Sequence, residues 1–117
     1  MKYLLLPHID EGAWGALTKA EQEERVAAFD GYGRALREEG AFVAAYRPQP
    51  SAAAKTVRVI DGSTLIKDGP LADVKEQLSG VYVIDVVDLD AALSWAARNP
   101  AASFGVVDVR PVWGPPS

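Results

Sequence analysis

The sequence contains no cysteine, only one histidine and no long hydrophobic run. Without cysteine the chain can form no disulfide, no thiolate metal site and no cysteine nucleophile, which fits a reducing cytoplasm. A single histidine gives poor support to a metal site, because several ligands would have to converge on the ion. The longest apolar stretch near the start, YLLLP, is too short for a signal peptide or a membrane span. We therefore expect no bound metal and no contact with a membrane.

Basic charge is scarce as well. There are 12 Lys and Arg residues against 16 Asp and Glu residues, which gives a formal net charge of −4. Without a basic field a protein attracts few phosphates, so general nucleic-acid binding is disfavoured. The glycines of DGYGRALREEG fall inside a predicted helix rather than between a strand and a helix, and so they form no phosphate loop. We predict a cytoplasmic protein without a cofactor.

The composition is that of one ordinary globular domain. Hydrophobic residues make up 49% and charged residues 24% of the 117 residues. A chain of this length and composition can bury a core without disulfides or a structural metal. No internal repeat or low-complexity linker divides the chain. We predict a single domain over residues 1–113 and a flexible tail over residues 114–117.

Two segments carry the signals of α-helices. Thr18 and Glu21 form a capping box at the start of a helix predicted over residues 19–39. Asp88 can cap a second helix over residues 89–99, which Pro100 ends. The apolar stripes at helical spacing are Val26, Phe29, Gly33 and Leu36 in the first helix, and Leu89, Ala92, Leu93 and Ala96 in the second.

The remaining segments favour strands. Short apolar runs predict strands in KYLLLPH (2–8), AFVAAYRP (41–48), GVYVIDVVD (80–88) and SFGVVDVRPVW (103–113). KTVRVIDGSTLIKDG (55–69) predicts a β-hairpin, because Asp61-Gly62 suits the positive φ angles of a tight turn. KDGPLADVKEQ (67–77) predicts a turn followed by a short helix, and IDEGAWGAL (9–17) predicts a loop.

The order strand, helix, strand, hairpin, strand, helix, strand predicts an α+β fold. It is the ferredoxin-like β-α-β-β-α-β pattern with an extra hairpin strand. Two helices can cover only one face of such a sheet, so the other face must be solvated, hold a ligand or meet another sheet. Because the strands are so apolar, we expect two subunits to pack sheet to sheet as a homodimer.

Several motifs resemble one known family. DGP at Asp68–Pro70, KEQLSGVYVID at Lys75–Asp85 and VRPV at Val109–Val112 are similar to the YCII-related proteins, in particular to the branch named for a D-G-P-F motif. The resemblance covers residues 1–113. Leu71 stands where that branch has Phe, so the apolar anchor is kept and any ring-stacking role is lost.

The resemblance implies a dimeric α+β barrel. Most members of the family have no assigned reaction. A few relatives in the wider superfamily are lyases, including one that removes chloride from a chlorinated hydroxyquinol, and these are associated with a histidine and an acidic partner in the cleft. Other members of the D-G-P-F branch are encoded beside alternative sigma factors, which implies an accessory or regulatory role.

His8 and Asp68 are the candidate catalytic residues. His8 ends the first strand on the same face as Leu4 and Leu6, and histidine is the natural proton shuttle. The alternative is a structural histidine at a strand end. The short YCII branch carries its histidine in the first helix, which has none here, and reads Asp-Pro where this chain has Asn99-Pro100. Asp68 either contributes to the site or serves only the turn chemistry of Asp-Gly-Pro.

The candidate ligand-binding residues are Arg58, Lys75, Glu76, Tyr82, Asp108 and Arg110. Asp108 and Arg110 project from one face of the closing strand, and an arginine such as Arg110 or Arg58 could hold a carboxylate or phenolate bidentately. The alternative for these charges is an exposed or intersubunit ion pair. Lys75 and Glu76 are adjacent on the predicted short helix, about 100° apart, and therefore could not easily face one pocket. Tyr82 is expected to pack with its hydroxyl at the cleft.

These features predict a homodimer that binds a small organic molecule, neutral or anionic, in its cleft. The expected chemistry is proton transfer of the elimination or isomerisation type, with His8 as the base and Arg110 or Arg58 holding negative charge. The alternative is a non-catalytic ligand-binding or accessory module linked to a sigma factor.

Overall fold

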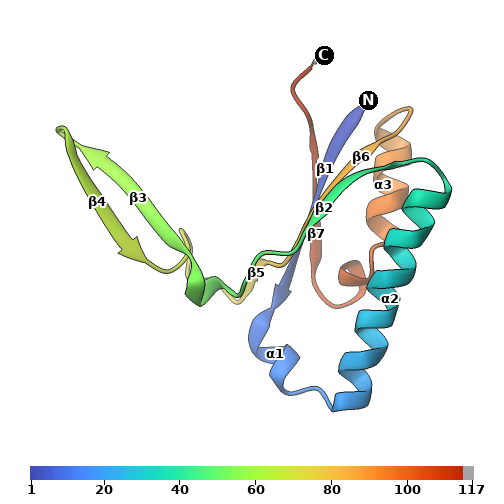
Figure 1. Cartoon of the computed structure of the whole chain (residues 1–117), viewed down its shortest axis with the longest axis horizontal. Helices are drawn as coiled ribbons and strands as arrows, with labels where there is room; N and C mark the ends of the chain where they lie inside the picture. The colour runs from blue at the N-terminus through green and yellow to red at the C-terminus, as the bar shows by residue number, and fades with distance from the viewer. Residues whose placement is uncertain (115–117) are drawn as a thin grey trace.

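The computed structural model describes residues 1–114 and has two layers, a sheet and a pair of long helices (Figure 1). Residues 115–117 of the predicted tail lie outside the described residues. The strands are β1 (Lys2–Asp10), β2 (Phe42–Tyr46), β3 (Lys55–Ile60), β4 (Ser63–Asp68), β5 (Glu76–Leu78), β6 (Val81–Asp85) and β7 (Val106–Pro111). The helices are α1 (Glu11–Gly15), α2 (Lys19–Glu38) and α3 (Leu89–Arg98), with short 3₁₀ turns η1 (Ser51–Ala53) and η2 (Pro100–Ser103).

The main sheet is antiparallel throughout. β1 pairs with β7 on one side and with β5 and β6, one after the other, on its other side, while β2 pairs with β6. The resulting spatial order β2-β6-β1-β7 is that of the split β-α-β pattern, with the β3–β4 hairpin added between β2 and β5. The predicted ferredoxin-like α+β fold is therefore confirmed.

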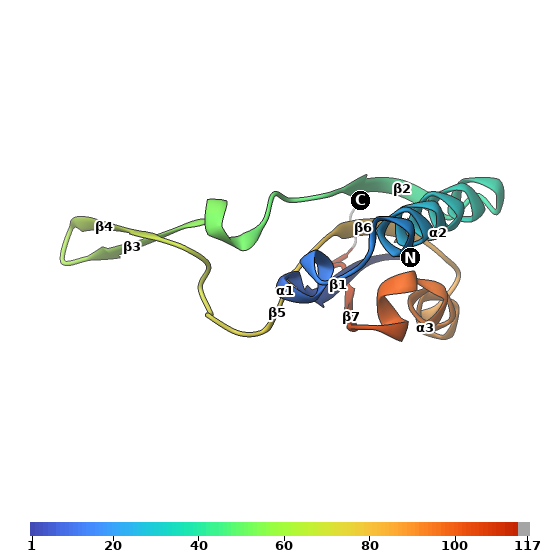
Figure 2. The same cartoon turned by 90° about the horizontal axis from the view of Figure 1, so that it is seen from below.

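The core lies between the sheet and the helices. Alternate residues of each strand face α2 and α3, so Tyr3 and Leu5 of β1 and Ile84 of β6 are buried, whereas the residues between them point to the opposite face. The helices contribute Tyr32 and Leu36 from α2 and Ala92, Trp95 and Ala96 from α3. Figure 2 shows both helices on one side of the sheet.

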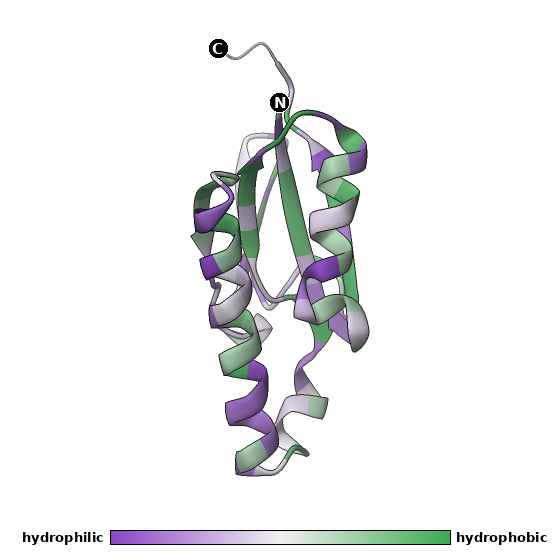
Figure 3. Ribbon diagram, turned by 90° about the vertical axis from the view of Figure 1, so that its right-hand side faces the viewer, coloured by the Kyte–Doolittle hydropathy of each residue, from purple (hydrophilic) through white to green (hydrophobic). Residues whose placement is uncertain are grey.

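The apolar stripes predicted for the helices are partly wrong. Val26 is 43% exposed, because the hydrophilic N-terminal turns of α2 extend past the end of the sheet (Figure 3). Leu89 and Leu93 are each 47% exposed, and the buried face of α3 is centred on Trp95 instead. The caps are as predicted: Thr18 and Glu21 form the capping box of α2, and the Asp88 side chain accepts from the backbone of Ala91.

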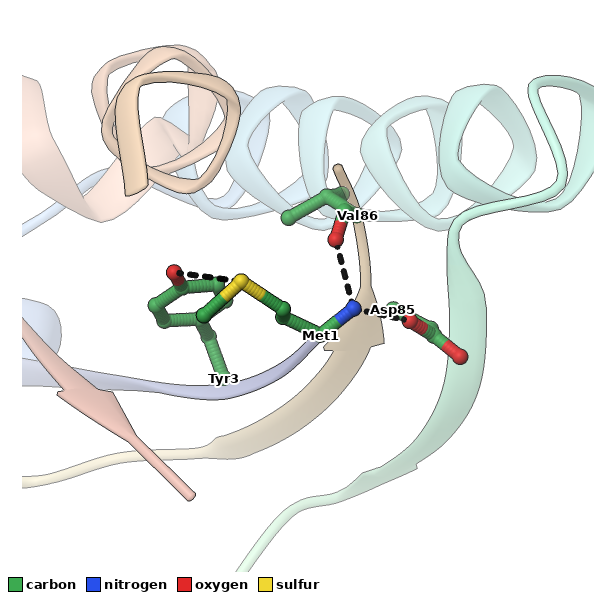
Figure 4. Close-up of polar contacts among 4 residues, drawn as sticks. All are labelled: Met1, Tyr3, Asp85 and Val86. Atoms are coloured by element: carbon green, nitrogen blue, oxygen red, sulfur yellow. Dashed lines mark hydrogen bonds and ion pairs between the residues drawn. The ribbon is translucent and has the colours of Figure 1, made fainter. Parts of the chain in front are cut away.

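The start of β1 is fixed to the end of β6. The Met1 ammonium donates to Asp85 Oδ1 at 2.9 Å and to the Val86 carbonyl at 2.8 Å, and the Tyr3 hydroxyl lies 3.9 Å from Met1 Sδ (Figure 4). The hydrogen bond and the positive charge of this ammonium lower the pKa of Asp85. The pair thus ties together two neighbouring strands of the sheet at their ends.

The segment after the hairpin differs from the prediction. No helix forms over residues 69–77; after Gly69, with φ 98°, the chain bends and then joins β1 as β5. Pairing of Gln77 with Ile9, and hydrogen bonds from the Gln77 side chain to the carbonyls of Ala72 and Val74, stabilise this extended path. Pairing with a distant strand has overridden a weak local helical preference.

Two other local predictions also need correction. Residues 11–15, predicted as part of a loop, form the single helical turn α1, capped by Asp10. Trp113, the last residue of the segment predicted as the closing strand, lies beyond β7 and is 95% exposed. Within residues 1–114, no helix is long and apolar enough to cross a membrane.

Candidate functional site

An open groove of about 780 Å³ lies on the face of the sheet away from α2 and α3, near the ends of β1, β5 and β7 and beside α1. This volume is in the range of small-molecule sites. The groove is lined by His8, Asp10, Ala13, Val74, Lys75, Glu76, Phe104, Val106 and Asp108. Four of the predicted site residues, His8, Lys75, Glu76 and Asp108, are thus brought together.

His8 lies on the central strand of the groove, between β7 and β5. It is paired with Val106 of β7 on one side and with Leu78 of β5 on the other. Its Nδ1 is 2.8 Å from the carbonyl oxygen of Leu6. Because a carbonyl can only accept, Nδ1 must be the protonated nitrogen, and in the neutral ring Nε2 keeps its lone pair. The local geometry therefore prepares Nε2 to take a proton.

Two carboxylates face each other beside His8. Asp10, two residues further along β1, is directly opposite Glu76 of β5. Asp10 Oδ1 accepts from the backbone amides of Gly12 at 3.0 Å and Ala13 at 3.3 Å, and its Oδ2 is 3.6 Å from Lys75 Nζ. Like charges directly opposite in a sheet repel, and the exposed Lys75 offsets this only weakly. This end of the groove is accordingly acidic, with one exposed cation.

Asp108 lies on the other side of His8. It is opposite Leu6 of β1 and hence diagonal to His8, at roughly 7–8 Å between Cα atoms for such a pair. Its Oδ2 is 3.3 Å from Nε of Arg110, which faces the same side but does not line the groove. Asp108 is therefore paired with Arg110 and lines the same groove as His8.

Three predicted site residues lie elsewhere. Asp68 and Arg58 are on the β3–β4 hairpin, where Asp68 forms an exposed ion pair with Lys55. Tyr82 faces the helices instead of the groove, with its ring perpendicular to that of Tyr32 at 5.4 Å between centroids. Burial raises the pKa of Tyr82. Tyr82 therefore belongs to the packing between sheet and helices.

Five groove residues were not predicted from the sequence: Asp10, Ala13, Val74, Phe104 and Val106. Asp10 could have been found, because it is two residues beyond His8 and shares its strand face once β1 is extended to residue 10. Lys75 and Glu76 both line the groove, Lys75 from the bend before β5 and Glu76 from the first position of that strand, where a helix had been predicted.

The fold and this groove define a small α+β protein with a polar site on an open sheet face. A sequence model of the YCII-related domain matches residues 1–114, and the chain belongs to this family. A relative, an uncharacterized protein of Rhizobium meliloti (strain 1021), is 38% identical over 114 residues, which cover 96% of this chain and 92% of the relative.

A solved structure confirms the fold type. The 5-chloro-2-hydroxyhydroquinone dehydrochlorinase of Burkholderia phenoliruptrix AC1100, in complex with 2,5-dihydroxybenzoquinone, superposes with a TM-score of 0.55 at 14% identity. The match covers 97% of this chain and 94% of the dehydrochlorinase. Membership of the D-G-P-F branch within the family stays a prediction.

Proposed function

We propose that this protein binds a small organic molecule in the groove around His8 and that His8 acts there as a general base in an elimination or isomerisation. The single observation that carries the proposal is the hydrogen bond of 2.8 Å between His8 Nδ1 and the Leu6 carbonyl, which leaves Nε2 as the proton acceptor in a groove of ligand size. A positioned base of this kind contributes about 10²–10⁴-fold to a rate.

In an elimination, Nε2 removes a proton from a C–H or O–H bond of the ligand. The electron pair of that bond forms a new double bond, and an anion leaves from a neighbouring carbon. The imidazolium then returns the proton to water. In an isomerisation the double bond shifts and the same proton returns to another ligand atom.

The groove favours a ligand with an oxygen substituent over a strongly anionic one. Its acids Asp10, Glu76 and Asp108 repel a multiply charged anion, and Lys75 is the cation that lines it. A hydroxylated ring, with one oxygen held by Lys75 and its apolar face on Val106 and Phe104, suits these walls. The hydroxylated quinone bound to the structurally similar dehydrochlorinase is of this class.

We further propose that the working unit is a homodimer in which the open sheet faces of two subunits pack together. Leu4 and Leu6 of β1 and Val83 of β6 lie on this face and contact neither α2 nor α3. A second copy of the same sheet would cover them, since stacked sheets exclude water from apolar inner faces.

The test uses 5-chloro-2-hydroxyhydroquinone as a probe substrate and 2,5-dihydroxybenzoquinone as a probe ligand. Wild-type protein should release chloride from the first, and His8→Gln should lower the rate by about 10²–10⁴-fold while changing the affinity for the second less than tenfold. Lys19→Gln, at the start of α2 and away from the groove, is the control and should match the wild type.

The outcomes separate the candidate functions. Binding of the quinone with chemical-shift changes at the groove, but with equal rates for wild type and His8→Gln, would reject the catalytic role and leave a ligand-binding module. If neither probe perturbs the groove residues, the hydroxylated-ring ligand class is refuted. Co-purification with a sigma factor in that case would favour the accessory role.

A further inference from the structure

The β3–β4 hairpin stands away from the rest of the molecule (Figure 1). Its strands pair with each other and, among residues 1–114, with no other strand. Asp61 and Gly62, with φ 49° and 78°, form the tight turn at its tip, and the Gly69 amide donates to the Ala54 carbonyl at 2.8 Å to close its base. A two-stranded hairpin alone is at best marginally stable in water. We call residues 55–68 the arm.

The arm exposes apolar side chains on both faces. Val57, Val59 and Ile66 share one face and are 64%, 63% and 68% exposed. On the opposite face Ile60 and Leu65 are 47% and 52% exposed. Such a cluster on an isolated ribbon is a surface that needs a cover. Nothing within residues 1–114 supplies that cover.

The dimensions of the chain show how much surface is uncovered. The radius of gyration is 16.2 Å, compared with about 13 Å for a compact domain of this length. The accessible surface is 7914 Å², compared with about 6200 Å² for a compact monomer of this mass. The excess of about 1700 Å² is twice the roughly 800 Å² that each partner contributes to a standard interface.

The direction of the arm identifies the occupant. In both Figure 1 and Figure 2 the arm leaves the body on the side of the sheet opposite to α2 and α3. This is the side on which the proposed second subunit would pack. Each arm strand has six residues and is about 20 Å long, whereas packed sheets lie about 10 Å apart. The arm is therefore long enough to pass the partner's sheet and lie along its flank.

The groove lies where the arm joins the sheet. Val74, Lys75 and Glu76, on the return from the arm, form one wall, and His8 and Asp108 of the sheet face form the floor. A second subunit that packs on this sheet face and contacts the arm must cover the open side of the groove. The same contact that covers the arm would thus enclose the candidate site and exclude water from it.

We infer that the arm of each subunit clasps a second copy of this chain, and that this clasp closes the groove around His8. The inference rests on the proposed homodimer and ligand site, and it adds the element that holds the dimer together. A second copy is the occupant that the geometry favours, because the bare sheet face and the arm require cover on the same side and in the same contact.

The decisive variant removes the arm. Because the Ala54 carbonyl and the Gly69 amide are already hydrogen-bonded, residues 55–68 can be replaced by a two-residue Asn-Gly turn. Sedimentation should show a wild-type dimer and a dissociation constant at least about 100-fold higher for the armless protein, the scale of losing several interface anchors. Ile66→Glu should weaken the dimer in the same direction. Val87→Glu, at an 80% exposed position before α3, is the control and should not.

Two further readouts separate this inference from the ligand proposal. Amide protons of the arm should be protected from exchange in the dimer and lose protection on dilution. The affinity for 2,5-dihydroxybenzoquinone should fall with dimer dissociation, whereas His8→Gln should leave the dimer intact. A monomeric wild type, or an armless protein that dimerises equally well, would overturn the clasp. A stable arm-dependent dimer that binds no quinone would uphold the clasp and refute only the proposed ligand class.

Discussion

The protonation of His8 can be tested without a substrate. At about pH 9 an imidazole is neutral, and the proton resides on one of two nitrogens. The hydrogen bond of 2.8 Å to the Leu6 carbonyl exists only when Nδ1 carries that proton. A net contribution of about 0.5–1.5 kcal/mol for such a bond shifts the tautomer ratio roughly 2- to 13-fold toward Nδ1–H. Raising the pH should therefore leave the proton on Nδ1 more often than in an unstructured peptide.

The assay is a two-bond ¹H–¹⁵N correlation spectrum of the imidazole, and His8 is the only histidine, so one set of ring signals appears. In the folded protein the tautomer ratio should shift toward Nδ1–H, with the lone pair on Nε2, by roughly 2- to 13-fold. Urea-unfolded protein at the same pH is the internal control and should return to the ratio of a free histidine. A folded protein with the same ratio as the unfolded chain, or with a larger share of Nε2–H, would refute the assignment of Nε2 as the base.

Three further predictions concern the frame around the site. Tyr32→Phe should cost about 1 kcal/mol in urea unfolding, because a buried hydroxyl that donates to a backbone carbonyl at 2.8 Å is lost; Tyr46→Phe, at a 73% exposed position, should cost nothing measurable. Gly105→Ala should destabilise by about 3 kcal/mol or more and broaden the His8 signals, since the new Cβ would lie 2.2 Å from the His8 carbonyl oxygen. Because its pKa is lowered, Asp85 stabilises the fold above its unfolded pKa and loses this effect as the pH falls through its folded pKa; Asp85→Asn should lower the melting temperature at pH 7, with the difference vanishing in acid.

Local signals in the sequence were sufficient to predict most of the helices, their caps and the hairpin turn. The capping box of Thr18 and Glu21, the Asp88 cap and the Asp61-Gly62 turn each depend on a few adjacent residues, and each forms as predicted. Where a distant partner decides the conformation, local signals fail. Residues 76–78 extend because β1 pairs with them, a contact across more than 60 positions that no local pattern encodes.

The candidate site was recoverable only in part for the same reason. Strand alternation placed His8 on one face of the first strand with Leu4 and Leu6, and Asp108 on one face of the closing strand with Arg110. The register of β1 with β7 then brought His8 and Asp108 together. Arg58 could not be placed from its strand pattern, since nothing in the pattern of β3 says that the hairpin leaves the main sheet. The tertiary structure decides which strands lie side by side, and this in turn decides which side chains belong to the site.

The sheet face that carries the candidate site is positioned by packing on the opposite face, which contacts the helices. Pro7 is fully buried, and its ring packs against Gly80, where an added Cβ would lie 3.2 Å from the ring. Because neighbouring strand residues point to opposite faces, locking Pro7 on the helix side fixes His8 on the groove side. The contact of Gly105 with the His8 carbonyl restrains the same strand from the β7 side. The position of His8 in the groove thus depends on packing at residues that do not line it.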